Sequence, residues 1–306
     1  MPHASPRYPL VLVPGLLGFV RLAGWPYWYG VVEALAEIGV QAIPVLVSPV
    51  HSTEMRGEQL LREIERIRRE TGADRVHLIG HSHGGLTVRY AAAQRPDWVA
   101  SVTSLAGPHQ GSEAADFIDL RCPPGSLKER LAILLTRLIA GLCAWLETGW
   151  RGPRLPCDPR AALDALTRCG VAAFNERFPQ GLPAEWGGEG DHEVNGVRYY
   201  SWSGTLQPGN GQGRNRRDPS YWLCRLWARQ FVREREANDG LVGRFSSHLG
   251  QVIRSDYPLD HLDIINQFCG RVPPGIDPLA LFVEHARRLA EVEAPKRGDG
   301  PVPEKL

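Results

Sequence analysis

The stretch Gly80-His81-Ser82-His83-Gly84-Gly85 places a hydroxyl nucleophile between glycines. An apolar run at residues 75–79 precedes it and predicts a buried strand, and residues 86–94 after it predict a helix. A tight turn between the two strains the serine backbone, so the positions two residues before and after the serine must lack bulky side chains. Gly80 and Gly84 meet this need. The pattern predicts a nucleophilic serine whose hydroxyl stands clear of the sheet.

A serine hydroxyl needs a base that takes its proton and an acid that orients the base. Among the histidines after Ser82, only His261 comes directly after the last predicted strand, residues 251–257. Asp239, in the turn Asn238-Asp239-Gly240, is the candidate acid, because serine, acid and histidine follow in this order in the α/β-hydrolase fold. On position alone, four other aspartates compete with it: Asp218, Asp256, Asp260 and Asp263.

Two backbone N–H groups are candidates for holding the negative charge of the reaction. The first predicted strand, residues 8–13, ends at the loop of residues 14–18, and a loop at this place usually supplies one oxyanion donor. We therefore expect the N–H groups of Leu16 and His83 to form the oxyanion site. The aromatic segment Tyr27-Trp28-Tyr29 that follows is able to line a pocket or to pack as core.

The predicted elements around these residues alternate between strands and helices. Such alternation predicts one α/β domain, residues 1–306, with a mostly parallel central sheet flanked by helices and a site at the carboxyl ends of the strands. Beyond the elements named above, the strands are 40–47, 99–105 and 197–203, and the helices are 31–38, 57–70, 160–178 and 279–292.

Residues 112–164 interrupt the alternation and contain no predicted core strand. Leucines and other apolar residues recur at helical spacing from Leu127 to Leu146, and further apolar residues lie off this stripe. The segment is either a packed surface helix or a helical lid that turns its apolar face to a lipid surface. The chain end, residues 294–306, is expected to be frayed.

Composition excludes several classes of partner. A net charge of +1 gives no reason to expect nucleic acid, and no apolar stretch is long enough to span a bilayer. Residues 1–9 lack an export signal, so we expect a protein made without a cleavable signal or one from which it has been removed. The six cysteines form no Cys-x-x-Cys pair and favour free thiols, with a bridge between Cys122 and Cys157 as the alternative.

Several stretches spread along the chain form a recognisable set: Arg56-Gly57-Glu58-Gln59-Leu60, Leu78-Ile79-Gly80-His81-Ser82-His83-Gly84-Gly85, Pro108-His109-Gln110-Gly111-Ser112, Val194-Asn195-Gly196-Val197, Tyr200-Ser201-Trp202-Ser203-Gly204, Asn238-Asp239-Gly240-Leu241-Val242-Gly243, Ser246-Ser247-His248-Leu249-Gly250 and His261-Leu262-Asp263 with Asn266-Gln267. In this set the chain closely resembles the true bacterial lipases of the Pseudomonas and Burkholderia type, the family I triacylglycerol lipases. The resemblance covers residues 8 to 290 and is highly specific.

The resemblance implies roles that spacing alone left open. It implies Asp239 as the acid and His261 as the base, and it implies that Arg56 braces the loop carrying the Leu16 oxyanion donor. It makes the leucine-rich segment near residues 126–147 an interfacial lid. It also implies a structural Ca²⁺ ion, whose ligands are the carboxylates of Asp218 and Asp263, the side-chain oxygen of Gln267 and the carbonyl of Arg271.

Two positions depart from the family pattern. The family begins its oxyanion loop with His-Gly, where this chain has Pro14-Gly15, so the hydrogen bonds of that histidine are missing. The many members with one disulfide carry its cysteines where this chain has Gly187 and Phe245, so that bridge cannot form. The resemblance implies secretion, while the missing signal leaves signal-independent export or a cytoplasmic location open.

The expected function is hydrolysis of long-chain acylglycerol esters at a lipid–water interface, through an acyl-enzyme, by a calcium-stabilised monomer. A carboxylesterase or polyester depolymerase with the same triad is the nearest alternative. A catalytically inert lipid-binding protein is a second alternative, to which Pro14 gives its only support. A metal site at His81 and His83 is not expected, because nothing nearby in the sequence completes a ligand set.

Overall fold

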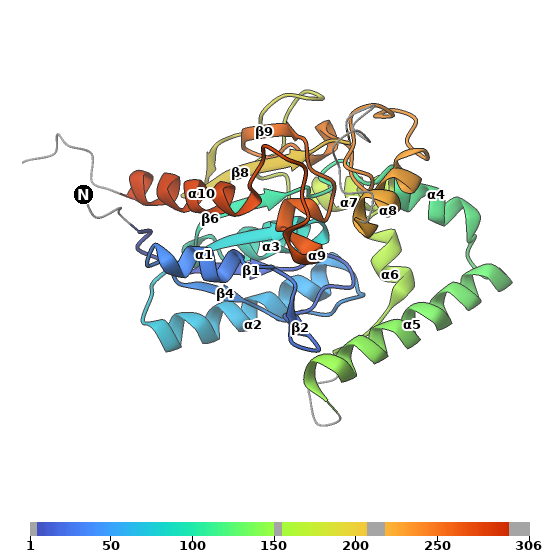
Figure 1. Ribbon diagram of the computed structural model, residues 1–306, viewed down its shortest axis with the longest axis horizontal. Coiled ribbons are helices and arrows are strands. Elements are labelled where there is room, and N and C mark those ends of the chain that lie inside the picture. The colour runs from blue at the N-terminus through green and yellow to red at the C-terminus, as the bar shows by residue number, and fades with distance from the viewer. Residues whose placement is uncertain (1–4, 150–154, 207–217, 294–306) are drawn as a thin grey trace, which may run out of the picture.

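A computed structural model of the protein describes residues 5–149, 155–206 and 218–293. Six strands form the parallel part of its central sheet, and their neighbour relations confirm the predicted alternation (Figure 1). The order across the sheet is β4 (Ala42–Pro44), β1 (Leu10–Val13), β5 (Val76–His81), β6 (Val99–Leu105), β8 (Val197–Gly204) and β9 (Gln251–Tyr257). The short β7 (Glu193–Val194) pairs antiparallel with β8, and β2 (Arg21–Leu22) forms a separate hairpin with β3 (Trp25–Pro26).

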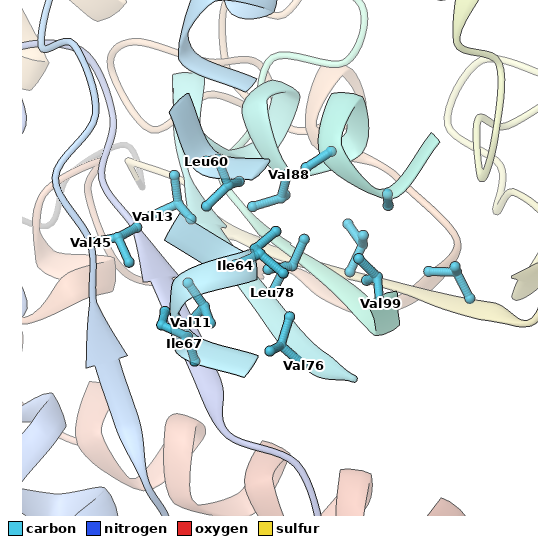
Figure 2. Packing of buried hydrophobic residues seen from close by; sticks show 14 of the residues in the cluster. Val11, Val13, Val45, Leu60, Ile64, Ile67, Val76, Leu78, Val88 and Val99 are labelled. Carbon is cyan, nitrogen blue, oxygen red and sulfur yellow. The ribbon is translucent and has the colours of Figure 1, made fainter. Parts of the chain in front are cut away.

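Helices cover both faces of the sheet, which explains why β1 and β5 are buried along their whole length. On one face, α2 (Thr53–Thr71) and α3 (His83–Gln94) pack on the strands. Figure 2 shows Leu60, Ile64 and Ile67 of α2 in one cluster with side chains of β1 and β5, among them Val11 and Leu78. On the other face, α1 (Val31–Glu37) and α10 (Pro278–Glu293) bury Leu35 and Phe282 with Leu10 and Leu12. Alternate residues of β1 therefore serve two cores.

Some predicted boundaries are wrong. The strand expected over residues 40–47 is reduced to β4, whose last residue, Pro44, has no N–H group to donate to a neighbour. The helix expected over residues 160–178 is divided into α6 (Pro159–Asp164) and α7 (Arg168–Arg177). Thr167 starts the second of these helices, because its side chain accepts a hydrogen bond from the Gly170 N–H.

The insertion contains α4 (Glu113–Arg121), α5 (Leu127–Thr148) and α6, and none of its described residues forms a strand, as predicted. In Figure 1, α5 lies at the edge of the molecule, away from the sheet. The remaining elements are α8 (Pro219–Ala228), α9 (Gln267–Gly270) and the 3-10 turns Pro96–Trp98, Phe245–Ser247 and Asp263–Ile265. The expected frayed tail, residues 294–306, lies outside the described residues.

All six cysteines are free thiols, Cys122 and Cys157 included. At Gly187 and Phe245, the two positions at which the resemblance implied that no bridge forms, an added Cβ atom on residue 187 would lie 3.2 Å from the Phe245 ring. Across the described residues, no helix has the length and apolar character needed to cross a membrane.

Candidate active site

Ser82 occupies the strained turn between β5 and α3, with φ 56° and ψ −125°. A non-glycine residue rarely adopts a positive φ, and this outlier is held by the close packing around it. A Cβ atom at residue 80 would collide with the backbone of Gly84, and one at residue 84 would collide with the Val13 carbonyl. Both flanking positions therefore require glycine, because any side chain would collide with neighbouring backbone, as the sequence pattern predicted.

The structure brings one of the five competing aspartates to His261. Oδ2 of Asp239 lies 2.8 Å from Nδ1 of His261, and both side chains are almost wholly buried. The other carboxylate oxygen accepts hydrogen bonds from the N–H groups of Leu241, at 2.9 Å, and Val242, at 2.7 Å. Asp256 instead pairs with Arg254 at the surface, and the other three aspartates gather elsewhere. Of the five aspartates, Asp239 therefore is the one bonded to the His261 ring, and the catalytic roles of the two residues stay predictions.

The loop of residues 14–18 crosses directly over the nucleophile. A Cβ atom at residue 15 would lie 2.8 Å from the Ser82 Cβ, so only glycine fits there. His83 is the first residue of α3, and N–H groups in the first turn of a helix have no acceptor within it. Leu16 lines the same cavity as Ser82. Both predicted oxyanion donors thus belong to segments that meet at the serine.

Arg56 is completely buried beneath this loop. Its guanidinium donates hydrogen bonds to the carbonyls of Pro14 and Ser48, and its Nε atom donates to the Thr87 hydroxyl at 3.1 Å. Burial lowers the pKa of Arg56 to about 10, which leaves it charged at neutral pH. Pro14 is the first residue of the loop, so its contact with Arg56 supports the predicted role of Arg56 in bracing that loop.

Tyr27 and His81 belong to the site, although no pattern in the sequence indicated the contacts between them. Tyr27 does both things considered for it, since it is buried and lines the cavity. Its hydroxyl contacts the Gly15 N–H and the His81 ring, and the His81 ring also reaches the His261 carbonyl. In the sequence, His81 was considered only as the residue between Gly80 and Ser82 and, with His83, as an improbable metal ligand. Its position next to the nucleophile was the available signal.

A largely apolar cavity of about 360 Å³ opens at Ser82 and His261. Its walls come from the inserted helices, with Ile118 on α4, Ile133 on α5 and Leu163 on α6. The lining also includes the charged residues Glu129 and Arg160, whose side chains lie 3.5 Å apart. The insertion therefore forms much of the substrate-facing wall.

The helix α5 has two different faces. One face lines the cavity through Ile133 and Thr136, and it buries Ala140. The carboxylate of Glu147 near its C-terminus accepts hydrogen bonds from the N–H groups of Val20 and Arg21. Large apolar side chains are exposed along the rest of the helix: Leu127, Leu131, Leu134, Leu135, Leu138, Ile139, Leu142, Trp145 and Leu146. A face of this size is rare on a surface that contacts water alone.

Three buried carboxylates, those of Asp218, Asp260 and Asp263, offer ligand atoms within 4.8 Å of one another. Asp218 and Asp263 were predicted as metal ligands, whereas Asp260 had been considered only as a competing catalytic acid. Burial raises the pKa of Asp260, and the nearby Asp218 carboxylate adds to this. The side-chain oxygen of Gln267 accepts a hydrogen bond from the Trp25 indole at 3.3 Å. The ligand roles of the Gln267 side chain and the Arg271 carbonyl stay predictions.

Comparison with known proteins agrees with this geometry. The family model described as alpha/beta hydrolase fold matches residues 8–137. A triacylglycerol lipase of Pseudomonas fragi is 49% identical, over 93% of this chain and 97% of its own length. One of Vibrio cholerae is 46% identical, over 94% of this chain and 89% of its own length.

Solved structures with low sequence identity show the same fold. The Staphylococcus hyicus lipase superposes with a TM-score of 0.62 at 19% identity, over 95% of this chain and 98% of that one. Lipase 1 from Pelosinus fermentans superposes with a TM-score of 0.61 at 18% identity, over 94% of this chain and 99% of that one. Given the identity to the curated relatives over nearly its whole length, the chain belongs to the triacylglycerol lipase family of the α/β-hydrolase fold.

Proposed function

We propose that the protein is a triacylglycerol lipase in which Ser82, His261 and Asp239 hydrolyse the ester bond. The observation that carries this proposal is the Asp239–His261 pair at 2.8 Å, which shares an apolar cavity with the serine of the strained turn. Triacylglycerol lipases that cover nearly the whole chain at 46–49% identity support the substrate class.

The proposed reaction follows from the positions of Ser82, His261 and the two oxyanion donors. The Ser82 oxygen attacks the ester carbonyl carbon, and its proton passes to Nε2 of His261. The N–H groups of Leu16 and His83 hold the carbonyl oxygen, which becomes negative. His261 then gives the proton to the leaving alcohol, and the acyl group stays on the serine. A water molecule attacks this acyl-enzyme by the same route, which releases the fatty acid and restores the serine.

The substrate we propose is a long-chain acylglycerol presented at a lipid–water interface, with residues 112–164 as a lid insertion. The support is the exposed apolar face of α5, whose opposite face lines the cavity at Ile133 and Thr136. An interfacial helix needs such a face, since burying apolar side chains in lipid provides its binding energy. A lid in this place would couple lipid contact to access of the substrate to Ser82.

The Asp218, Asp260 and Asp263 cluster fits a structural calcium ion. Calcium prefers carboxylate oxygens, and three buried carboxylates at this separation repel one another without a cation. These three residues would hold the ion. When bound, it would neutralise their charge and connect the start of α8 to the loop that carries His261.

The test is the hydrolysis rate of tributyrin and triolein below and above their solubility limits, with Ser82→Ala as the control. We expect a sharp rise once an emulsion forms and no turnover by the variant. A smooth saturating curve would favour the esterase alternative. An active Ser82→Ala protein would refute the catalytic proposal altogether.

A further inference from the structure

We propose that Tyr27 is a positioning residue for the ester hydrolysis, because its hydroxyl and the His81 ring connect the oxyanion loop to the catalytic base by hydrogen bonds. The inference rests on the proposed function, since it gives Leu16 and His261 the roles described above. It explains how the loop keeps its place without the histidine that the family pattern has where this chain has Pro14.

The donors and acceptors of the connection are determined by chemistry. The Gly15 N–H lies 3.0 Å from the Tyr27 hydroxyl and is able only to donate. The His261 carbonyl is able only to accept, which places the proton of a neutral His81 on Nε2, so the Tyr27 hydroxyl donates to the bare Nδ1 of His81, at 2.7 Å. Nε2 of His81 donates to the His261 carbonyl at 2.9 Å. One arrangement satisfies every group from Gly15 to His261.

The surroundings keep both side chains in the neutral forms that this arrangement needs. His81 is 1% exposed and Tyr27 is 6% exposed. Burial raises the pKa of Tyr27, and burial lowers the pKa of His81 well below its usual value. The ring centroids of His81 and His261 lie 4.7 Å apart, and the nearby His261 lowers the pKa of His81 further. A cationic His81 would carry a proton on Nδ1 as well, so the Tyr27 hydroxyl would have to accept from that atom and could no longer donate to it.

Both ends of the connection lie at the reacting atoms. Gly15 directly precedes Leu16, and its backbone is packed against Ser82. The strand β1 ends at Val13, so the sheet does not hold the loop that follows. Pro14 has no N–H group to donate. The start of the loop is held by two hydrogen bonds: Arg56 donates to the Pro14 carbonyl, and the Gly15 N–H donates to the Tyr27 hydroxyl. Loss of the hydroxyl would leave the Gly15 N–H without this partner.

Tyr27→Phe tests the proposal, because it removes the hydroxyl and keeps the ring that packs on Phe19 and Trp28. The matched control is Tyr90→Phe, which removes the hydroxyl of another buried tyrosine, bonded to Glu58 at 2.6 Å, from α3. On dissolved p-nitrophenyl butyrate, we expect kcat of the Tyr27 variant to fall by about 10- to 100-fold with KM within twofold. The control is expected to keep its kcat.

A transition-state analogue separates positioning from a general loss of stability. Butaneboronic acid forms a tetrahedral adduct with an active-site serine and places an oxygen in the oxyanion site. We expect its Kd for Tyr27→Phe to rise by the same factor as kcat/KM falls, while the melting temperature falls no more than in Tyr90→Phe. A Tyr27→Phe variant with unchanged boronate Kd and wild-type kcat/KM would overturn the inference. Losses of kcat/KM that follow the fall in melting temperature in both variants would overturn it as well.

Two variants of His81 examine the two halves of the connection. His81→Asn keeps an acceptor near the Nδ1 position, and His81→Gln keeps a donor near the Nε2 position. Adding Tyr27→Phe to His81→Gln is expected to cost little more, because the bond to Tyr27 is already lost. Fully additive losses would overturn the connection. If Ser82→Ala retains activity, the proposed function fails; if only the Tyr27 and His81 variants behave as wild type, this inference alone fails.

Discussion

The Nδ1 atom of His261 lies 2.8 Å from Oδ2 of Asp239, and the main chains of the two residues are also joined, by a hydrogen bond from the His261 N–H to the Asp239 carbonyl at 3.1 Å. Asp239 is itself held by the N–H groups of Leu241 and Val242. The carboxylate is therefore fixed before any substrate arrives, and it presents one oxygen to the ring. In the proposed reaction, this arrangement would orient Nε2 of the histidine for proton transfer.

Asp239→Asn is expected to lower kcat by roughly 10³- to 10⁴-fold with little change in the melting temperature. An amide keeps an oxygen for the two N–H groups but presents its own N–H to Nδ1 of His261. The ring then carries its proton on Nε2, where it cannot accept the serine proton. Steady-state kinetics on a dissolved ester checks this, and retention of more than a tenth of wild-type kcat would contradict it.

Gly15→Ala is expected to reduce kcat by about 100-fold, because its Cβ atom would lie 2.8 Å from the Ser82 Cβ and would displace the oxyanion loop. Gly141→Ala is the matched control. Its Cβ atom would meet nothing within 4 Å, and alanine stabilises a helix interior by about 1 kcal/mol relative to glycine. Equal kcat values for the two variants on a dissolved ester would show that the loop tolerates displacement.

Replacing Leu134 and Leu138 together by glutamine is expected to reduce triolein hydrolysis in emulsion and to leave hydrolysis of a dissolved ester within twofold. These side chains are 54% and 60% exposed, so their loss affects folding little. Burying one leucine in an apolar phase is worth about 1.5–3 kcal/mol, which predicts at least tenfold weaker adsorption to lipid for the pair. Vesicle co-sedimentation measures this, with exposed Val232→Gln as the control.

A chelator is expected to lower the melting temperature of the wild-type protein. At a Ca²⁺ concentration of 100 Kd, the ion would add about 2.7 kcal/mol to the free energy of unfolding. Asp218→Asn is expected to lose this response and, in chelator, to melt above the wild-type protein, because one of three repelling carboxylates is gone. The surface variant Asp97→Asn serves as the control, and a wild-type protein insensitive to chelator would argue against the ion.

Glu234 is expected to make stability depend on pH. Burial raises its pKa from 4.5 to about 7 in the folded protein. Between these values the folded state holds a proton that the unfolded state has released, so this stabilising contribution is complete below pH 4.5 and is lost as the pH rises through 7. Relative to Glu234→Gln, the wild-type melting temperature is expected to fall from pH 5 to pH 8. A difference in melting temperature between wild type and Glu234→Gln that stays constant from pH 5 to pH 8 would exclude this effect. Glu63→Gln serves as the surface control.

The sequence by itself was enough for the features that depend on local sterics and periodicity. The glycines around Ser82 revealed the turn because backbone strain there leaves no room for a Cβ atom, and this cause acts between near neighbours. The strand over residues 99–105 has its predicted bounds and is almost wholly buried, because a run rich in apolar and β-branched residues favours a buried strand. The strand over residues 251–257 also has its predicted bounds, although most of its residues are only partly buried.

The tertiary structure decided which distant groups meet. Five aspartates were compatible with the acid by position, and only folding shows that the Asp239 carboxylate faces His261 while Asp260, one residue away from that histidine, joins Asp218. The bonds of Tyr27 and His81 join segments separated by 54 and 180 residues. No periodicity encodes such contacts, because they depend on how strands far apart in the chain are placed side by side in the sheet and on how the loops after them are packed.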